Sequence, residues 1–185
     1  MSTAQYKQYF TQNGGNPMKY PEIDESKLQE VMRIIETAAS LMEETGLMEE
    51  KDWEGDTEAG SELAALQKQL REITGNEKLQ ITDFNAYWSY TSLETVARNA
   101  LHQPPKKCGM TDEQLTDLIR RISELDFDVP ENALEATTDY FIHVLEVETG
   151  LDDVSDYIYC PEEFGLDLHA GLDEITAKIL ADSIR

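Results

Sequence analysis

The sequence has few cysteines and no long apolar run. Its 185 residues include two cysteines, Cys108 and Cys160, which lack the Cys-x-x-Cys spacing of a metal knuckle. Two cysteines without a signal peptide favour a reducing compartment. No apolar stretch approaches the roughly 20 residues of a membrane helix. The first 19 residues have neither the apolar core of a secretion signal nor a basic transit pattern. We therefore expect a cytoplasmic protein that does not bind a membrane.

A catalytic constellation is also missing. The three histidines are scattered, and none has a partner at the spacing of a zinc-binding helix. No Gly-rich phosphate loop follows a predicted strand. Glu43-Glu44 and Glu49-Glu50 resemble the magnesium-binding acids of helical nucleotide pyrophosphohydrolases, but the second acid motif of such a site is incomplete. We expect no enzyme, no cofactor and no metal site, and keep a magnesium-dependent pyrophosphohydrolase as the weakest alternative.

Positive charge is scarce as well. The chain has 38 acidic and 15 basic side chains, a net charge of −23. Residues 111–185 alone hold 20 acidic and 4 basic side chains, a net of −16. Such a field repels nucleic acid and anionic membranes and attracts basic proteins. The plainer interpretation, that the charge only keeps the protein soluble, remains open.

Apolar residues recur at spacings of three and four along most of the chain, which is typical of amphipathic helices. Residues 79–90 are aromatic and fit either a short helix or a strand. Two prolines, two lysines and a glycine interrupt the helical pattern at residues 102–110. We predict an all-α protein of two tandem small four-helix bundles, each with three long helices and one short one. The predicted parts are an irregular lead-in (1–21), a first bundle (22–101), a linker (102–110) and a second bundle (111–185).

The two halves share an order of features that indicates an internal repeat. A capped helix comes first in each half. A helix ending in Thr-Gly follows, at Gly75 and at Gly150. Ile81-Thr-Asp-Phe84 then corresponds to Val154-Ser-Asp-Tyr157, and a last helix closes each half. Because Thr45-Gly46 repeats the helix-ending signal a third time, a chance likeness of two helical units stays the alternative to a duplication.

The central segment of the second half carries a specific motif. Residues 155–161 read Ser-Asp-Tyr-Ile-Tyr-Cys-Pro and follow an acidic helix. They resemble the Ser-Asp-x-Ile-Tyr-Tyr-Pro segment of the immunity proteins of nuclease colicins and pyocins, and five of its six defined positions agree. Cys160 stands where that family has the second tyrosine. The resemblance covers residues 111–182 and implies a small helical fold that binds and neutralises a nuclease toxin.

The resemblance also implies where the toxin binds. In that family the tyrosines are central contacts, and acids of the second helix set the choice of partner. Here the acids of that helix recur at four- and seven-residue spacings, which places them on one face. We expect Tyr157, Ile158 and Tyr159 to be partly exposed beside them. The predicted partner-binding set is Glu135, Asp139, Glu146, Asp153, Asp156, Tyr157, Ile158, Tyr159 and Pro161. A second predicted patch, in the first half, is Asp83, Tyr87 and Trp88.

The expected function is therefore the inhibition of a basic toxin protein, with a nuclease as the favoured partner. A nuclease must be basic to hold phosphates, and an acidic inhibitor is steered to it quickly. The alternative is a DNA mimic that titrates a nucleic-acid-binding protein. A mimic should spread carboxylates over a long face, whereas an inhibitor should pair acids with a compact aromatic patch. We expect no direct binding of nucleic acid.

Overall fold

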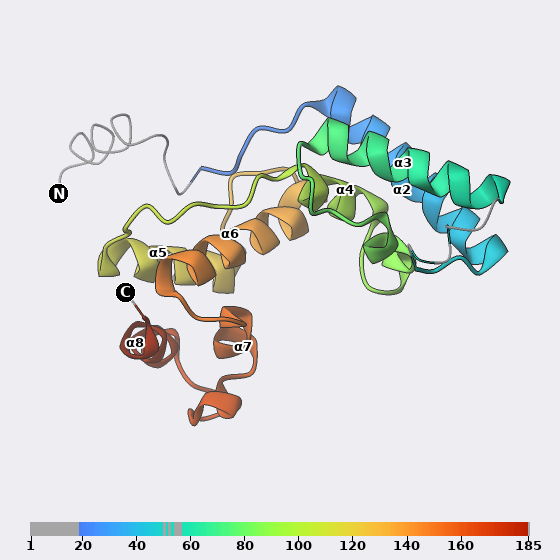
Figure 1. The fold of residues 1–185 in the computed structure, drawn as a ribbon. Coiled ribbons are helices and arrows are strands. Elements are labelled where there is room, and N and C mark those ends of the chain that lie inside the picture. The colour runs from blue at the N-terminus through green and yellow to red at the C-terminus, as the bar shows by residue number, and fades with distance from the viewer. Residues whose placement is uncertain (1–18, 50, 52, 54–56, 185) are drawn as a thin grey trace. The chain divides into compact units, whose positions relative to one another are not determined.

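The protein is helical throughout the part of the chain that the structure describes (Figure 1). The computed structural model describes residues 19–184 except residues 50, 52 and 54–56, and no strand occurs among them. The prediction of an all-α fold is confirmed. Within the same residues, no helix combines the length and the apolarity that crossing a membrane requires. The described chain divides into two compact units, residues 22–103 (the N-terminal unit) and residues 104–184 with residues 19–21 (the C-terminal unit).

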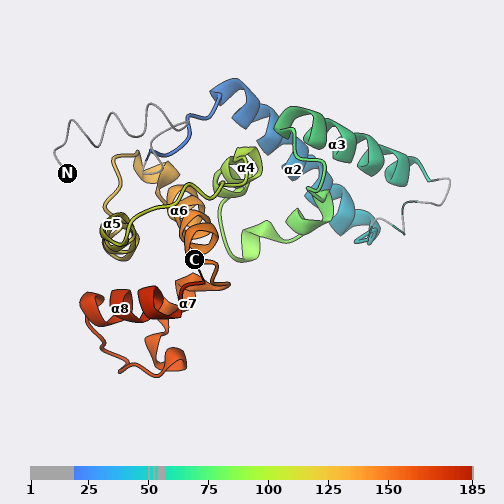
Figure 2. The same cartoon turned by 60° about the vertical axis from the view of Figure 1, so that its left-hand side comes forward.

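Among the described residues of the N-terminal unit, three α-helices and two short 3-10 helices are defined. They are α2 (Glu25–Thr45), α3 (Glu58–Thr74), η2 (Ile81–Phe84), η3 (Tyr87–Ser89) and α4 (Leu93–Leu101). Asp24 begins α2 because its carboxylate accepts the Ser26 backbone N–H at 2.9 Å. The apolar stripe of α2 packs against α3 and α4, and both views show α3 lying along α2 (Figures 1 and 2). The aromatic stretch 79–90, which the sequence allowed to be a short helix or a strand, contains the two 3-10 helices η2 and η3.

Trp53 follows α2 in an acidic stretch of the sequence, yet its side chain is in the core of the N-terminal unit. Its indole Nε1 donates a hydrogen bond to the Leu47 carbonyl at 3.2 Å. This bond satisfies the polar end of a buried aromatic ring. The segment after α2 is thus held by an apolar anchor, which a polar composition could not reveal.

Four α-helices form the C-terminal unit, with two 3-10 helices between them. They are α5 (Asp112–Glu124), η4 (Glu131–Ala133), α6 (Leu134–Thr149), α7 (Val154–Tyr159), η5 (Pro161–Phe164) and α8 (Leu172–Asp182). A reciprocal cap begins α5: the Thr111 hydroxyl accepts the Gln114 N–H at 3.3 Å, and the Gln114 side chain accepts the Thr111 N–H at 2.7 Å. Helix α5 packs against α6 and α8, and α7 packs against α6 and α8.

The end of the predicted lead-in belongs to the core of the C-terminal unit. Tyr20 packs on that core, with its ring edge-on to Tyr140 and the ring centroids 5.9 Å apart. The rest of the lead-in, residues 1–18, lies outside the described residues. The end of the predicted lead-in therefore contributes an aromatic side chain to the core of the C-terminal unit, although the whole N-terminal unit separates the two in sequence.

Helices α2, α3 and α6 end in the same way. The hydroxyls of Thr45, Thr74 and Thr149 donate to the carbonyl four residues earlier, at 2.6, 2.8 and 2.7 Å. Each threonine precedes a glycine in the left-handed region, with φ of 73°, 68° and 71°. At Gly150 a Cβ would lie 2.9 Å from the Ile184 carbonyl oxygen, so only glycine fits. The helix-ending signal read from the sequence therefore has one geometry in all three places.

A buried carboxylate holds the end of the predicted linker. Glu148 on α6 is 3% exposed, and its oxygens accept backbone N–H groups from Cys108, Gly109 and Met110, the last two at 3.0 and 2.8 Å. Burial by itself raises the pKa of Glu148, but these hydrogen bonds outweigh it and the pKa lies below its ordinary value. The same carboxylate, together with burial, raises the pKa of the Cys108 thiol to about 12.

We expect Glu148→Gln to lower the free energy of unfolding of the C-terminal unit by about 1–3 kcal/mol at pH 7, because it replaces charge-assisted hydrogen bonds. A carboxyl with a lowered folded pKa contributes stability above its unfolded pKa and loses it as the pH falls through the folded value. The difference between wild type and variant should therefore be full at pH 7 and shrink below pH 4.5, the ordinary pKa of the group. Urea unfolding across this pH range measures the difference in unfolding free energy. A difference that does not change with pH would contradict a stabilising role of the ionised Glu148 carboxylate.

A candidate protein-binding groove on the C-terminal unit

Helix α6 carries both core and surface side chains. Phe141 and Leu145 are at most 1% exposed and pack against α5 and α7. Because successive residues on a helix turn by about 100°, the positions on the other side of α6 must face outward. Glu135 is exposed, and Asp139 and Ile142 are partly exposed. The burial of one face of α6 thus fixes the direction of its acids.

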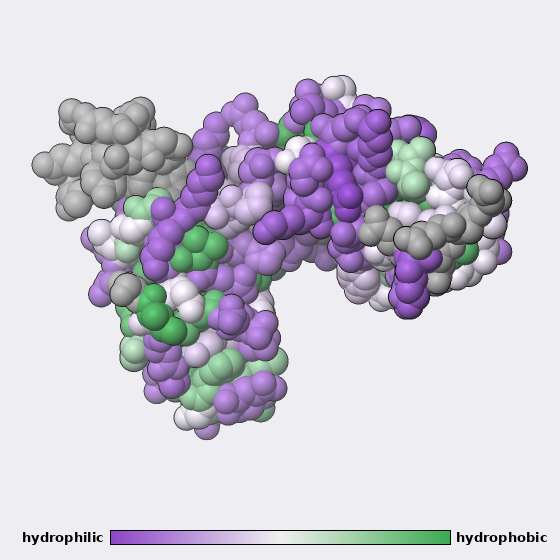
Figure 3. Space-filling model, in the orientation of Figure 1, coloured by the Kyte–Doolittle hydropathy of each residue, from purple (hydrophilic) through white to green (hydrophobic). Residues whose placement is uncertain are grey.

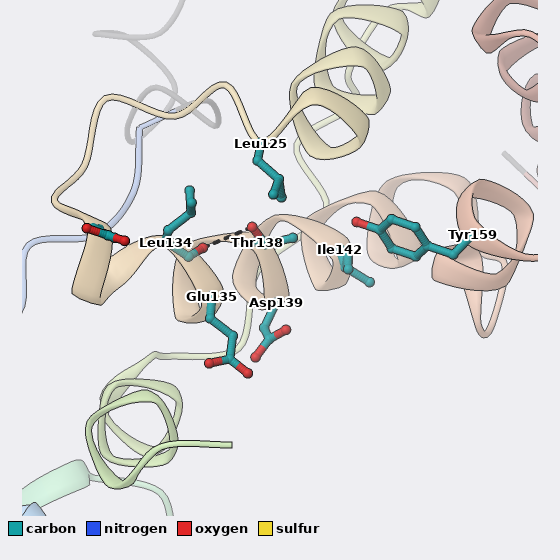
Figure 4. Close-up of a pocket in the computed structure, with 8 residues that line it drawn as sticks. Leu125, Leu134, Glu135, Thr138, Asp139, Ile142 and Tyr159 are labelled. Atoms are coloured by element: carbon teal, nitrogen blue, oxygen red, sulfur yellow. Dashed lines mark hydrogen bonds between the residues drawn. The ribbon is translucent and has the colours of Figure 1, made fainter. Parts of the chain in front are cut away.

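These outward positions line an open groove of about 390 Å³ (Figure 4). Figure 4 shows Tyr159 at one end, with its ring beside Ile142, and the carboxylates of Glu135 and Asp139 extending side by side from α6. The groove brings together residues from the end of α5, from η4 and α6, and from the last turn of α7. Its eight lining residues are Leu125, Glu131, Leu134, Glu135, Thr138, Asp139, Ile142 and Tyr159.

The groove is apolar along its length and acidic at its edge. Three of the eight lining residues are aliphatic, three are acidic and none is basic. The Thr138 hydroxyl donates to the Leu134 carbonyl at 2.9 Å, so it presents mainly its methyl group to the groove. Burial and the charge of Asp139 raise the pKa of Tyr159, which stays a neutral phenol at physiological pH. An aliphatic floor with carboxylates beside it suits a basic side chain with an aliphatic stem.

Tyr159 is the most exposed aromatic ring of the C-terminal unit, at 52%. Tyrosine offers a large, rigid contact area with a polar tip, which is why it is common at interface hot spots. Figure 3 shows a face that is mostly hydrophilic, with strongly apolar side chains in a few small clusters. The lining of the groove itself combines acidic and apolar side chains.

Leu125 lines the groove in an unfavourable backbone conformation. It ends α5 with φ 54° and ψ 35°, in the left-handed region that glycine prefers, and its side chain is 48% exposed. The following turn is held firmly: the Arg121 guanidinium donates to the Asp126 carbonyl at 2.9 Å and lies over the Phe127 ring. Leu125 therefore combines a strained backbone with an exposed apolar side chain at the groove.

Three of the predicted partner-binding residues meet in this groove, namely Glu135, Asp139 and Tyr159. The prediction that Tyr157 and Ile158 are partly exposed is wrong, since they are 6% and 7% exposed and belong to the core. The Tyr157 ring stacks on Phe164 at a centroid distance of 3.6 Å, and its hydroxyl donates to Asp182 at 3.2 Å. In a short helix such as α7, with six residues, the apolar face turns inward, so of these three residues only Tyr159 remains exposed.

The other predicted residues lie outside the groove. Pro161 is buried and begins η5, where its missing N–H costs nothing. Glu146 is half-buried, one oxygen lying 2.8 Å from Nδ1 of His143. Asp153 is exposed and precedes α7 with φ 55°, and Asp156 is half-buried within α7. The sequence missed the aliphatic lining, because Leu134 and Thr138 fit the inward stripe of α6 and Leu125 ends a helix where glycine is the ordinary signal.

The second predicted patch lies on the N-terminal unit. Asp83 and Trp88 are exposed, and Tyr87 is half-buried with its ring edge-on to Trp88, the centroids 5.3 Å apart. Tyr87 and Trp88 both belong to η3, which packs against α4. This patch and the groove belong to different units and are described separately.

No family model matches the chain, and no curated protein or solved structure matches it either. Across the described residues, no group of three or more His, Cys, Asp or Glu side chains is placed to hold a metal ion. The chemistry that the groove itself offers is molecular contact, through apolar area, carboxylates and one phenol.

We expect the two tyrosines of α7 to differ sharply in their effect on stability. Tyr157→Ala should lower the free energy of unfolding by about 3–5 kcal/mol, because it leaves a cavity in the core. Tyr159→Ala should change it by about 0.5 kcal/mol or less, as an exposed substitution does. Chemical denaturation of both variants measures the difference. Equal losses would mean that Tyr159 also supports the fold.

We expect Leu125→Gly to raise the free energy of unfolding by about 0.5–1 kcal/mol, because glycine adopts the left-handed conformation without steric cost. The same substitution should weaken binding of a partner to the groove, because it removes apolar lining. Leu125→Asn is the matched control, since asparagine tolerates this conformation and keeps a side chain. Thermal or urea unfolding measures the gain, and a clear loss of stability on Leu125→Gly would show that the Leu125 side chain is needed for folding.

Proposed function

We propose that this protein is an acidic inhibitor that binds a basic toxin, a nuclease, through the groove on the C-terminal unit. The observation that carries the proposal is the meeting of Glu135, Asp139 and Tyr159 around one apolar groove. Two of these residues come from the acidic helix and one from the Ser-Asp-x-Ile-Tyr motif, the two elements that the likeness to nuclease immunity proteins singles out. They are distant in sequence and lie together in the fold.

The charge of the chain supports the first step of binding. With a net charge of −23, the protein attracts basic partners over distances set by screening, about 8 Å at physiological ionic strength. Nucleases carry positive charge because they hold phosphates. An inhibitor of a lethal enzyme benefits from a fast encounter, which such steering provides.

The apolar groove supports the second step, which is slow release. Tyr159 presents its ring beside Ile142, and together with Leu134 it can cover an aliphatic or aromatic side chain of the partner. Central aromatic contacts in a dry surround commonly contribute 2 kcal/mol or more to binding. Because Cys160 replaces the second tyrosine of the family motif, we expect the aliphatic lining to supply part of the contact area that a second ring would give.

An inhibitor of this kind acts where its toxin would damage the producing cell, so we place the protein in the cytoplasm. The two reduced cysteines are consistent with this placement. A partly exposed tyrosine and an aliphatic floor also favour an inhibitor over a DNA mimic, since a mimic needs carboxylates rather than apolar contacts.

Stopped-flow binding to the basic nuclease encoded beside this gene tests the proposal. Tyr159→Ala should raise the dissociation rate roughly 30-fold, the equivalent of about 2 kcal/mol. Glu135→Gln combined with Asp139→Asn should lower the association rate severalfold at low salt and little at high salt, because the acids act mainly by steering. Nuclease activity should be blocked by the wild type.

Glu113→Gln and Leu168→Ala are matched controls, since both residues are exposed on the C-terminal unit away from the groove. Neither should change the dissociation rate. Loss of binding in proportion to charge at any acidic position, with Tyr159→Ala silent, would favour the DNA mimic. No binding to the nuclease at all would reject the toxin-inhibitor function.

A further inference from the structure

The N-terminal unit carries its own exposed apolar surface, distinct from the groove. Its exposed large apolar side chains, among the residues that the structure describes, are Met48, Trp88 and Tyr90, at 40%, 51% and 63%. Trp88 and Tyr90 flank one residue, and Met48 approaches the same segment, since its sulfur lies 3.8 Å from the Asn85 amide nitrogen. We call Met48, Tyr87, Trp88 and Tyr90 the η3 patch.

The backbone beneath the η3 patch is well ordered by hydrogen bonds. The N–H groups of Tyr90 and Thr91 both donate to the Tyr87 carbonyl, at 3.1 and 3.0 Å, and the Ser89 N–H donates to the Ala86 carbonyl at 3.0 Å. The Tyr87 and Trp88 rings meet edge to face. The segment therefore exposes the Trp88 and Tyr90 rings from a fixed turn, while Tyr87 packs against the core. Burial of apolar surface contributes about 25 cal/mol of stabilisation per Å². The exposed rings do not gain this stabilisation in the free protein, but they gain it when a partner covers them.

The charges around the η3 patch specify the kind of partner. The unit spanning residues 22–103 has 18 acidic and 7 basic side chains, a net of −11. Burial, together with the charge of the exposed Glu36 on α2, raises the pKa of Tyr87. Asp83, on the preceding helix η2, is also exposed. Aromatic faces beside carboxylates favour guanidinium groups, which stack on rings and pair with acids at once.

We propose that the η3 patch is a second docking surface, which binds an arginine-containing segment of a basic protein by stacking on Trp88 and Tyr90 beside Glu36 and Asp83. The inference goes beyond the proposed function, because it concerns the other unit and none of the groove residues. Lysine has no planar group to stack, so the patch should prefer arginine.

The two tryptophans of the chain provide a direct test. Trp88 is half exposed and Trp53 is buried, so their indole N–H resonances in a ¹⁵N correlation spectrum report separately on the patch and on the core. Trp88→Phe assigns the two resonances. The full-length protein is titrated with an octa-arginine peptide and with octa-lysine, at physiological salt so that unspecific attraction is screened.

Octa-arginine should shift the Trp88 resonance to saturation and leave that of Trp53 in place. Trp88→Ala should weaken its binding roughly fivefold, and Tyr90→Ala by a similar factor, as expected for loss of a stacked cation. Octa-lysine should bind less tightly. Leu168→Ala, which removes an exposed apolar side chain of the other unit outside the groove, is the matched control and should leave the affinity unchanged. Tyr159→Ala reports separately on binding of the peptide at the groove.

An unmoved Trp88 resonance, an unchanged affinity of Trp88→Ala, or equal affinity for the two peptides would overturn the η3 patch as an arginine site. Dependence of octa-arginine binding on Tyr159 instead of Trp88 would also overturn it, and would leave the groove as the cation-binding surface. Because the nuclease titration probes only groove variants, failure of one proposal is distinguishable from failure of the other.

Discussion

The C-terminal unit depends on the burial of one face of α6. Phe141 and Leu145 are inaccessible to solvent and contact the helices on both sides, so the rotation of α6 about its axis is fixed to within the tolerance of a close-packed core. With that rotation set, the helical repeat determines that Glu135, Asp139 and Ile142 point the other way. Near its end the same helix carries Glu148, whose carboxylate accepts hydrogen bonds from the backbone N–H groups of residues 108–110. Core, linker attachment and groove therefore rest on one element.

The groove includes features that lower stability and are compensated elsewhere. Leu125 holds a left-handed backbone, Tyr159 leaves half of its ring in water, and three acidic residues line one small surface. None of these helps the chain fold. Against them stand the Tyr157–Phe164 stack and the hydrogen bonds of Glu148. These unfavourable surface features are accommodated by a well-satisfied interior.

The two units repeat an order of elements and one helix-ending geometry, while their exposed chemistry differs. Thr74-Gly75 and Thr149-Gly150 terminate the second long helix of each unit with nearly the same hydrogen bonds. The segment that follows is 3-10 helical in one unit and forms α7 in the other. It exposes Trp88 and Tyr90 in the first case and Tyr159 in the second. Phe84 and Tyr157, which occupy matching places in the two motifs, are both buried.

The sequence by itself determined the helical class and most helix positions, and it led to the prediction of a basic partner. The spacing of apolar residues, the Thr-Gly helix ends and the excess of acidic side chains are local or additive properties of the sequence. They can therefore be recognised without knowledge of the fold. It also singled out Glu135, Asp139 and Tyr159. Only the tertiary structure decided that these three meet at one groove, that Tyr157 and Ile158 are core, and that Leu125 lines the surface. Exposure depends on which face of a short helix its neighbours cover, and that is a property of packing between distant segments, not of any one segment.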